Sequence, residues 1–204
     1  MALLAVAGAA AVVFVVHPFQ KSQAGPAAAS PASSPAVRQP LSVSAKATPS
    51  SSSQSSQQQS AQSLGALLAQ SVSDRRSIVN AVNSVSRCGP ALSQAPQVFE
   101  NAAASRQRLL ARLASLPGRS ALPSQMFDAL NGAWRASARA DQDFARWAQD
   151  ELSQGCSQND QSDPGFQAAA GPDSQATADK KAFARTWNPL AAEYGLTPYQ
   201  WDQL

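Results

Sequence analysis

Two cysteines are the most informative reactive side chains in this sequence. Cys88 and Cys156 are the only cysteines among its 204 residues, and they form no Cys-x-x-Cys motif. The absence of that motif gives little support to a redox-active pair. Each cysteine follows the expected end of a long helix, and the first and third helices of a bundle run parallel. We therefore predict a Cys88–Cys156 disulfide in an oxidising compartment, with two buried free thiols as the main alternative.

Histidine-based chemistry is excluded for most of the chain. The one histidine is His17, beside the N-terminal apolar run. The region after it can build neither a Ser/His/Asp nor a Cys/His catalytic set, and it lacks the commonest ligand of transition metals. The oxygen-rich stretch 159–165 lacks the ligand spacing of an EF-hand and is interpreted as a surface loop. We expect no cofactor and no resident metal, and an enzyme that uses carboxylates alone remains the rival hypothesis.

The net charge of the chain comes from its N-terminal part. The sequence has sixteen basic and thirteen acidic residues, and three of the basic ones are Lys21, Arg38 and Lys46. Thirteen basic and thirteen acidic residues are therefore left after residue 63. A neutral region creates no overall field that would steer a polyanion toward it. We therefore expect no nucleic-acid partner.

Three charged residues occupy positions where helical periodicity calls for apolar side chains: Arg75, Arg106 and Asp141. An isolated buried charge is costly, so charged groups at one level of a bundle are expected to pair. Counting back from the two cysteines at about 1.5 Å per residue places Arg75 and Asp141 at one level. We predict that Asp141 pairs with Arg75, with Arg106 close by or as the substitute partner. Such a contact would fix the register of the helices.

The elements that must position these residues are helices. Apolar residues recur at helical spacing through residues 64–204, and no strand pattern interrupts them. Gly and Pro residues divide this region into three long helices, expected over 64–86, 96–117 and 123–153. The predicted fold is all-α: an up-down-up bundle of three long helices plus a fourth C-terminal helix and short terminal turns, closed by one disulfide.

The last fifty residues carry their own helix signals. After a polar loop over 154–172, the fourth helix is expected over 174–187 with Asp173 as its N-cap. One short turn should begin at Asn188 and end at Gly195, and another should begin at Thr197 as a capping box.

Large side chains gather near the C-terminal end of the sequence. We interpret this cluster mainly as a lid on the core. The alternative is a docking face for a partner, formed by Trp187, Tyr194, Tyr199 and Trp201.

Residues 1–63 differ in character from the rest. Residues 1–19 contain an uninterrupted apolar run from Ala2 to Val16 and are expected to form a membrane anchor, or else a cleaved signal-like segment. Residues 20–63 are rich in Ser, Pro, Gln and Ala and are expected to be a disordered linker. Residues 64–204 are then the helical domain.

Three segments carry a resemblance to known proteins: AAASRQ at 102–107, ADQDFARWAQDE at 140–151 and WNPLAAEYGL at 187–196. With them, the chain resembles uncharacterised secreted or membrane-anchored helical proteins of high-GC Gram-positive bacteria. The resemblance covers residues 64–204. It implies a location in the cell envelope and assigns no activity and no site residues.

These features favour a membrane-tethered, extracytoplasmic helical module with a binding or structural role in the cell envelope. The expected location is the cell membrane, single-pass, with the C-terminal domain outside the cytoplasm; a secreted protein is the alternative. The expected partners are the membrane, through the N-terminal segment, and an envelope protein or cell-wall component. Two other hypotheses remain: a carboxylate-dependent hydrolase or transferase of the envelope, and a cytoplasmic domain on an inverted anchor.

Overall fold

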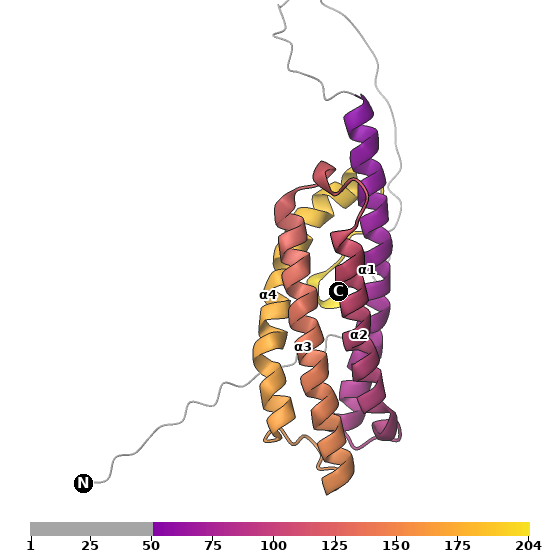
Figure 1. Ribbon diagram of the computed structural model, residues 1–204. Helices are drawn as coiled ribbons and strands as arrows, with labels where there is room; N and C mark the ends of the chain where they lie inside the picture. Colours follow the sequence, from indigo (N-terminus) through magenta and orange to yellow (C-terminus); the bar gives the residue numbers. More distant parts are fainter. Residues whose placement is uncertain (1–50) are drawn as a thin grey trace, which may run out of the picture. The chain divides into compact units, whose positions relative to one another are not determined.

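The computed structural model describes residues 51–204, which form a bundle of four long helices (Figure 1). The helices are α1 (Ser51–Ser86), α2 (Ala95–Ala114), α3 (Ser124–Gln154) and α4 (Pro164–Glu193). Three 3-10 turns join or follow them: η1 (Leu92–Gln94), η2 (Arg119–Ala121) and η3 (Trp201–Gln203). The all-α prediction is confirmed, with no strand among the described residues. The predicted anchor and the linker up to residue 50 lie outside them.

The first helix begins earlier than the sequence predicted. Residues 51–63 were assigned to the disordered linker, and this boundary was wrong because they form the first turns of α1. Ser60 and Ala61 are buried, and the Ser60 hydroxyl donates to the carbonyl oxygens of Ser56 and Gly118. Tyr194 donates a hydrogen bond from its hydroxyl to the Gln57 side chain, at 2.6 Å. Packing against these partners therefore overrides the low helix propensity of serine.

The fourth helix also begins earlier than predicted. Asp163, rather than Asp173, is its N-cap: one carboxylate oxygen accepts from the backbone N–H groups of Gly165 and Phe166 at 2.7 and 3.1 Å. The predicted boundaries at Pro172 and Pro189 were wrong, because α4 continues through both prolines. A proline inside a helix removes one hydrogen bond. The packing of α4 on α3 offsets this loss.

Gly165 shows how closely α3 and α4 approach each other. A Cβ atom added to Gly165 would lie 2.6 Å from the backbone nitrogen of Trp147. No larger residue fits this position without a shift of the two helices.

The predicted helix end at Gly195 is confirmed. Gly195 has a φ of +64°, and the backbone N–H of Leu196 donates to the Ala191 carbonyl oxygen at 2.8 Å. This is the six-to-one bond of a Schellman motif. The capping box predicted at Thr197 was wrong: the capping box that forms joins Gln200 to Gln203 at η3.

The predicted disulfide is confirmed at the lower end of the bundle in Figure 1. Cys88 and Cys156 are bonded, with 5.7 Å between their Cα atoms. They follow α1 and α3, which run in the same direction (Figure 1). The bond closes a loop of 68 residues. In the chain-entropy description such a loop stabilises the fold by about 4 kcal/mol.

The core consists of two apolar clusters. The upper cluster surrounds Trp134, Phe183 and Trp187 and includes Leu64, Leu67, Leu68, Leu109, Leu113, Leu116, Leu122, Met126, Phe127, Leu130, Leu190 and Leu204. The lower cluster surrounds Phe144 and Trp147 and includes Ile78, Val85, Phe99, Ala102, Ala140, Ala145, Ala148 and Ala169. Within residues 51–204, no helix combines the length with the apolar character that a bilayer span requires.

Candidate functional site

A layer of charged side chains lies between the two apolar clusters. It takes one residue from each helix: Arg75 of α1, Arg106 of α2, Asp141 of α3 and Lys180 of α4. We call these four residues the charge layer. Arg106, Asp141 and Lys180 are buried and Arg75 is half-buried. Each helix positions its charged residue on the stripe that otherwise supplies the core, so the layer interrupts the apolar interior.

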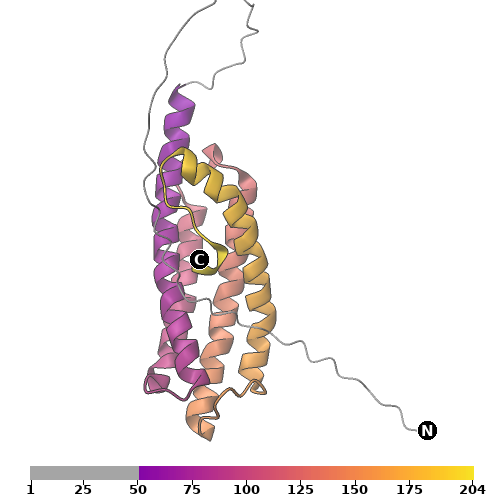
Figure 2. The same cartoon turned by 180° about the vertical axis from the view of Figure 1, so that it is seen from behind.

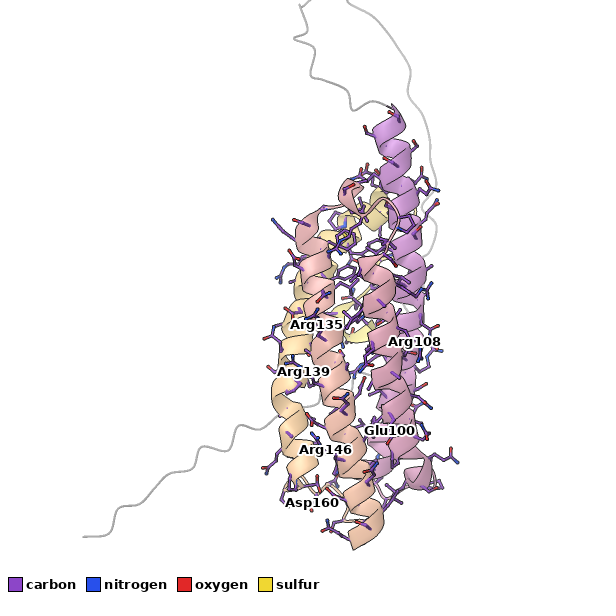
Figure 3. All side chains as sticks on the ribbon, in the orientation of Figure 1. Glu100, Arg108, Arg135, Arg139, Arg146 and Asp160 are labelled. Atoms are coloured by element: carbon purple, nitrogen blue, oxygen red, sulfur yellow. A yellow bond between two sulfur atoms is a disulfide. The ribbon has the colours of Figure 1, made fainter. Side chains whose placement is uncertain are left out.

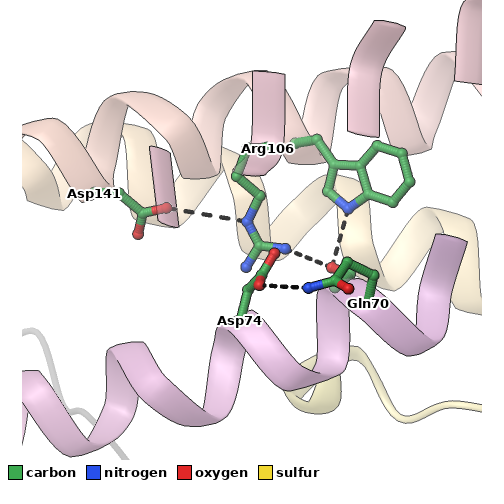
Figure 4. Close-up of polar contacts among 6 residues, drawn as sticks. Gln70, Asp74, Arg106 and Asp141 are labelled. Atoms are coloured by element: carbon green, nitrogen blue, oxygen red, sulfur yellow. Dashed lines mark hydrogen bonds and ion pairs between the residues drawn. The ribbon is translucent and has the colours of Figure 1, made fainter. Parts of the chain in front are cut away.

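Arg106 is the centre of this layer and is fully buried. Its Nη1 donates a hydrogen bond to the Ser71 hydroxyl, which also accepts from Trp134 Nε1 at 3.1 Å. On its other side, Arg106 Nε lies 4.0 Å from Asp141 Oδ2 (Figure 4). Ser71 thus holds the guanidinium between α1 and α3, where its charge faces Asp141.

The predicted pairing of Asp141 is correct for one partner and wrong for the other. The structure pairs Asp141 with Arg106, the substitute partner, and no ion pair joins Asp141 to Arg75 among the described residues. Burial raises the pKa of Asp141, and the positive charge of Arg75 opposes this rise. The two groups therefore still interact electrostatically. The axial levels were therefore estimated correctly. Counting along helix axes cannot say which of two neighbouring arginines turns inward.

Lys180 is the member of the layer that sequence reasoning missed. Burial lowers its pKa to about 7, and repulsion by Arg75 and Arg106 acts in the same direction. Lys180 follows Ala176 by four residues and precedes Phe183 and Trp187 by three and seven, on the apolar stripe of α4. That spacing was the available signal, because the helix expected over 174–187 already contains all four residues.

Burial dominates the electrostatics of Asp141 as well. It raises the pKa of Asp141 to about 6, and the charges of Arg106, Lys180 and Arg75 oppose the shift. Burial also lowers the pKa of Arg106, against the attraction of Asp141 and Asp74. Five buried polar atoms in and around the layer have no hydrogen-bond partner among the described residues: Asp74 Oδ2, Arg75 Nε, Arg106 Nε, Ser137 Oγ and Asp141 Oδ2. The layer is therefore a proton-sensitive and only partly satisfied part of the interior.

The predicted docking face divides into buried and exposed residues. Trp187 is fully buried, stacks on Phe183 with 6.0 Å between ring centroids, and donates from Nε1 to the Thr197 carbonyl oxygen at 3.0 Å. Tyr194 and Tyr199 are half-buried, and only Trp201 is exposed, at 38 %. The lid interpretation therefore holds for Trp187, and a docking face made of all four aromatic residues was wrong.

The polar loop before α4 uses its oxygen atoms locally. Asp160 Oδ1 accepts from the backbone N–H and the hydroxyl of Ser162, at 2.8 and 2.6 Å, and Asp163 caps α4. The hydrogen bond from the Ser162 side chain is the main cause of the lowered pKa of Asp160. Residues 51–204 contain no group of three or more acidic, cysteine or histidine side chains placed to hold a metal ion.

The outer surface carries charges of both signs. Glu100, Arg108, Arg135 and Arg139 project from the exposed faces of α2 and α3 (Figure 3). Residues 51–63 contain no charged residue, so the region that the structure describes stays balanced, at thirteen basic and thirteen acidic residues.

A shallow hollow lies beside η2, where the Arg119 guanidinium sits 4.6 Å from the centre of the Phe127 ring. No carboxylate lines this hollow, which is bordered by Gly118, Arg119, Ser120, Leu122, Ser124 and Phe127.

Comparison with known proteins gives no relative for this chain: no family model, no curated protein and no solved structure matches it.

Proposed function

We propose that this protein is a membrane-tethered, extracytoplasmic helical module that binds a partner in the cell envelope. The observation that carries the proposal is the Cys88–Cys156 disulfide. Structural disulfides form and persist outside the reducing cytoplasm. The N-terminal apolar run and the Ser/Pro-rich stretch after it supply an anchor and a spacer in the same proposal.

The charge distribution supports a protein or cell-wall partner rather than a nucleic acid. The balanced charge of residues 51–204 gives no net excess of basic charge that would attract phosphate backbones. The rival hypothesis of a carboxylate-dependent hydrolase needs two carboxylates that face each other across an open cleft. The most perturbed carboxylate, Asp141, is buried beside Arg106, and the hollow at η2 contains none. These observations favour binding over carboxylate catalysis.

Thiol labelling of intact cells tests the proposed location. Cells that express the full chain are treated with a maleimide that cannot cross membranes, before and after mild reduction. We expect no labelling of the wild-type protein before reduction and labelling of both cysteines after it. The Cys88→Ser variant leaves Cys156 as a free thiol and should react without reduction. A Cys88→Ser protein that reacts only with a membrane-permeant maleimide would place the domain in the cytoplasm and overturn the proposal.

A further inference from the structure

The seam between α1 and α4 is closed by a segment that belongs to neither helix. Helix α4 packs mainly on α3, and α1 packs mainly on α2. Residues 196–204 leave the end of α4, turn back and cross the upper part of this seam (Figure 2). They contact both flanking helices through η3. We call residues 196–204 the strap.

Two side chains of α4 hold the strap by its backbone. Asn188 donates from Nδ2 to the Tyr199 carbonyl oxygen at 3.0 Å, and its Oδ1 accepts from the Tyr199 N–H at 2.9 Å. Trp187 Nε1 donates to the Thr197 carbonyl oxygen at 3.0 Å. These three bonds do not depend on the side chains of Thr197 and Tyr199. Side chains that bond a backbone on both its donor and acceptor sides are typical of grooves that bind extended peptides.

Three side chains of the strap pack on the upper cluster: Leu204 and the half-buried Leu196 and Tyr199. Leu204 is fully buried and belongs to the upper cluster. Trp201 is exposed, with Lys181 Nζ 4.5 Å from the centre of its ring. The other strap residues with exposed side chains are Thr197, Pro198, Gln200 and Asp202. The strap therefore sits on α1 and α4 as a bound peptide would, with a bonded backbone, one fully buried aliphatic anchor, two half-buried apolar contacts and a row of exposed side chains.

The strap is joined to the bundle through a single turn. Gly195, with its φ of +64°, ends α4 and starts the strap. Strap opening needs changes only at this turn, because α4 ends before it and η3 is a separate short turn. Opening would expose the apolar side chains beneath Leu204, which belong to the upper cluster.

We propose that the groove beneath the strap is a peptide-binding site that the strap occupies in cis. Its ligand is an extended segment of a partner protein that presents an aliphatic side chain where Leu204 now lies. The inference rests on the proposed binding role and names the surface and the class of partner. A tether of one turn gives the strap an effective concentration on the order of millimolar, so the intact protein binds such a segment weakly until the strap opens.

A peptide competition experiment tests the groove. The full chain carrying Leu204→Asp loses the anchor of the strap and keeps every groove residue of α1 and α4. The probe is a fluorescent peptide with the sequence of residues 196–204, and fluorescence anisotropy measures its binding. We expect saturable binding to the Leu204→Asp protein and at least about tenfold weaker binding to the wild type, whose own strap competes. Adding Asn188→Ala removes two hydrogen bonds and should weaken binding by about tenfold again.

The matched control is the same peptide with Asp in place of its last Leu, which should not bind. If the folded Leu204→Asp protein binds neither peptide, or binds both equally, the proposal is overturned. A wild-type dimer that the Leu204→Asp change dissociates would assign the groove to the strap of a second copy and also overturn it. All these measurements use purified protein, so their failure is distinct from a failure of the location experiment.

If the Leu204→Asp protein does not fold, hydrogen exchange of the wild-type protein tests whether the strap opens on its own. The Tyr199 amide should exchange at least about 100-fold faster than the amides of Phe183 and Trp187, because the strap opens without the bundle. Equal exchange rates would mean that the strap opens only on global unfolding, and the proposal would fall.

Discussion

The two ends of the bundle are closed in different ways. The lower cluster is tied by the Cys88–Cys156 bond, and its rings pack closely, with 5.6 Å between the centroids of Phe99 and Phe144 and 5.1 Å between those of Trp147 and Phe166. The upper cluster is closed by the strap, through three hydrogen bonds and Leu204. A covalent closure resists local opening, whereas a hydrogen-bonded segment can open alone. We therefore expect the lower end of the bundle to resist local opening and the upper end to open more easily.

The charge layer separates these two regions. Arg106 and its partners interrupt the apolar contacts that would otherwise join the clusters. A buried ion pair adds little net stability compared with apolar residues of the same size. Its structural contribution is specificity: a slip of one helix against another would leave Arg106 or Asp141 without its partner. The packing of both clusters therefore depends on the same alignment of the helices along their axes.

The largest expected effect comes from removing the disulfide. We expect the Cys88→Ala, Cys156→Ala double variant to lose about 4 kcal/mol of unfolding free energy, since the unfolded chain regains the freedom of a 68-residue loop. Chemical denaturation measures the loss. Hydrogen exchange should show a larger drop in protection around Phe144 than around Trp187. Equal drops at both sites would contradict the division of the core into two regions.

A slightly smaller effect is expected in the charge layer. Asp141→Ala strands the buried Arg106 guanidinium and should cost about 3 kcal/mol, near the low end for a broken buried pair because Arg106 keeps its bond to Ser71. The control is Asp128→Ala on the same helix, whose side chain is exposed. Thermal and urea unfolding compare the two variants. If they unfold alike, the layer does not hold the helices in register.

The close contact between α3 and α4 predicts the next effect. Gly165→Ala should cost about 1–3 kcal/mol, because the added methyl group meets the Trp147 backbone. Gly171→Ala is the matched control on the same helix, since nothing lies within 4 Å of a Cβ added there. That change should alter the unfolding free energy by less than about 1 kcal/mol, because the helix propensity gained with Ala is offset by crowding of its Cβ against the Pro172 ring. Destabilisation of the same size in both variants would show that the helix contact is not the cause.

A further expected effect is a dependence of stability on pH. The pKa of Asp141 is raised from 3.8 to about 6 in the folded protein, so its contribution is present below pH 3.8 and is lost as the pH rises through 6. The pKa of Lys180 is lowered from 10.5 to about 7, so its contribution is present above pH 10.5 and is lost as the pH falls through 7. Together these two groups give a stability minimum near pH 6–7.

Denaturation curves between pH 4 and pH 9 test this profile through differences between variants. Lys180→Met should flatten the alkaline side of the minimum, and Asp141→Asn should flatten the acidic side. Arg108→Ala, at an exposed position on α2, should leave the profile unchanged. Parallel profiles for the wild type and Lys180→Met would show that Lys180 does not titrate inside the fold.

The sequence was most informative where periodic apolar residues and cysteines agreed. The first three helices, the disulfide, the helix end at Gly195 and the burial of Arg106 and Asp141 all followed from spacing. The two helix starts did not. Ser60 is buried because Gly118, far away in the sequence, approaches it, and no local propensity reports such a contact. Pro172 was interpreted as the end of the loop before the fourth helix, because the hydrogen bond that a proline removes is local, whereas the packing that offsets this loss is tertiary.

The detailed contacts of the strap could not be predicted from the sequence either. A lid could be predicted from the density of aromatic residues near Trp187 and Trp201. The bonding of Tyr199 by Asn188 could not, because Asn188-Pro189 is a common helix start and was interpreted as one. The same interpretation ended the predicted fourth helix at residue 187, whereas α4 continues to Glu193.

The unbroken length of α1 has a mechanical consequence. At about 1.5 Å per residue, its 36 residues span about 54 Å, from the end of the chain's Ser/Pro-rich stretch to the disulfide. A force applied to the N-terminal end of α1 would act along the helix axis and would tend to slide α1 past α2. Since Cys88 is bonded to Cys156, α1 could not be drawn out of the bundle beyond that point. Such a force would reach the upper cluster before the lower one, because the part of α1 that enters the bundle first packs there through Leu64, Leu67 and Leu68.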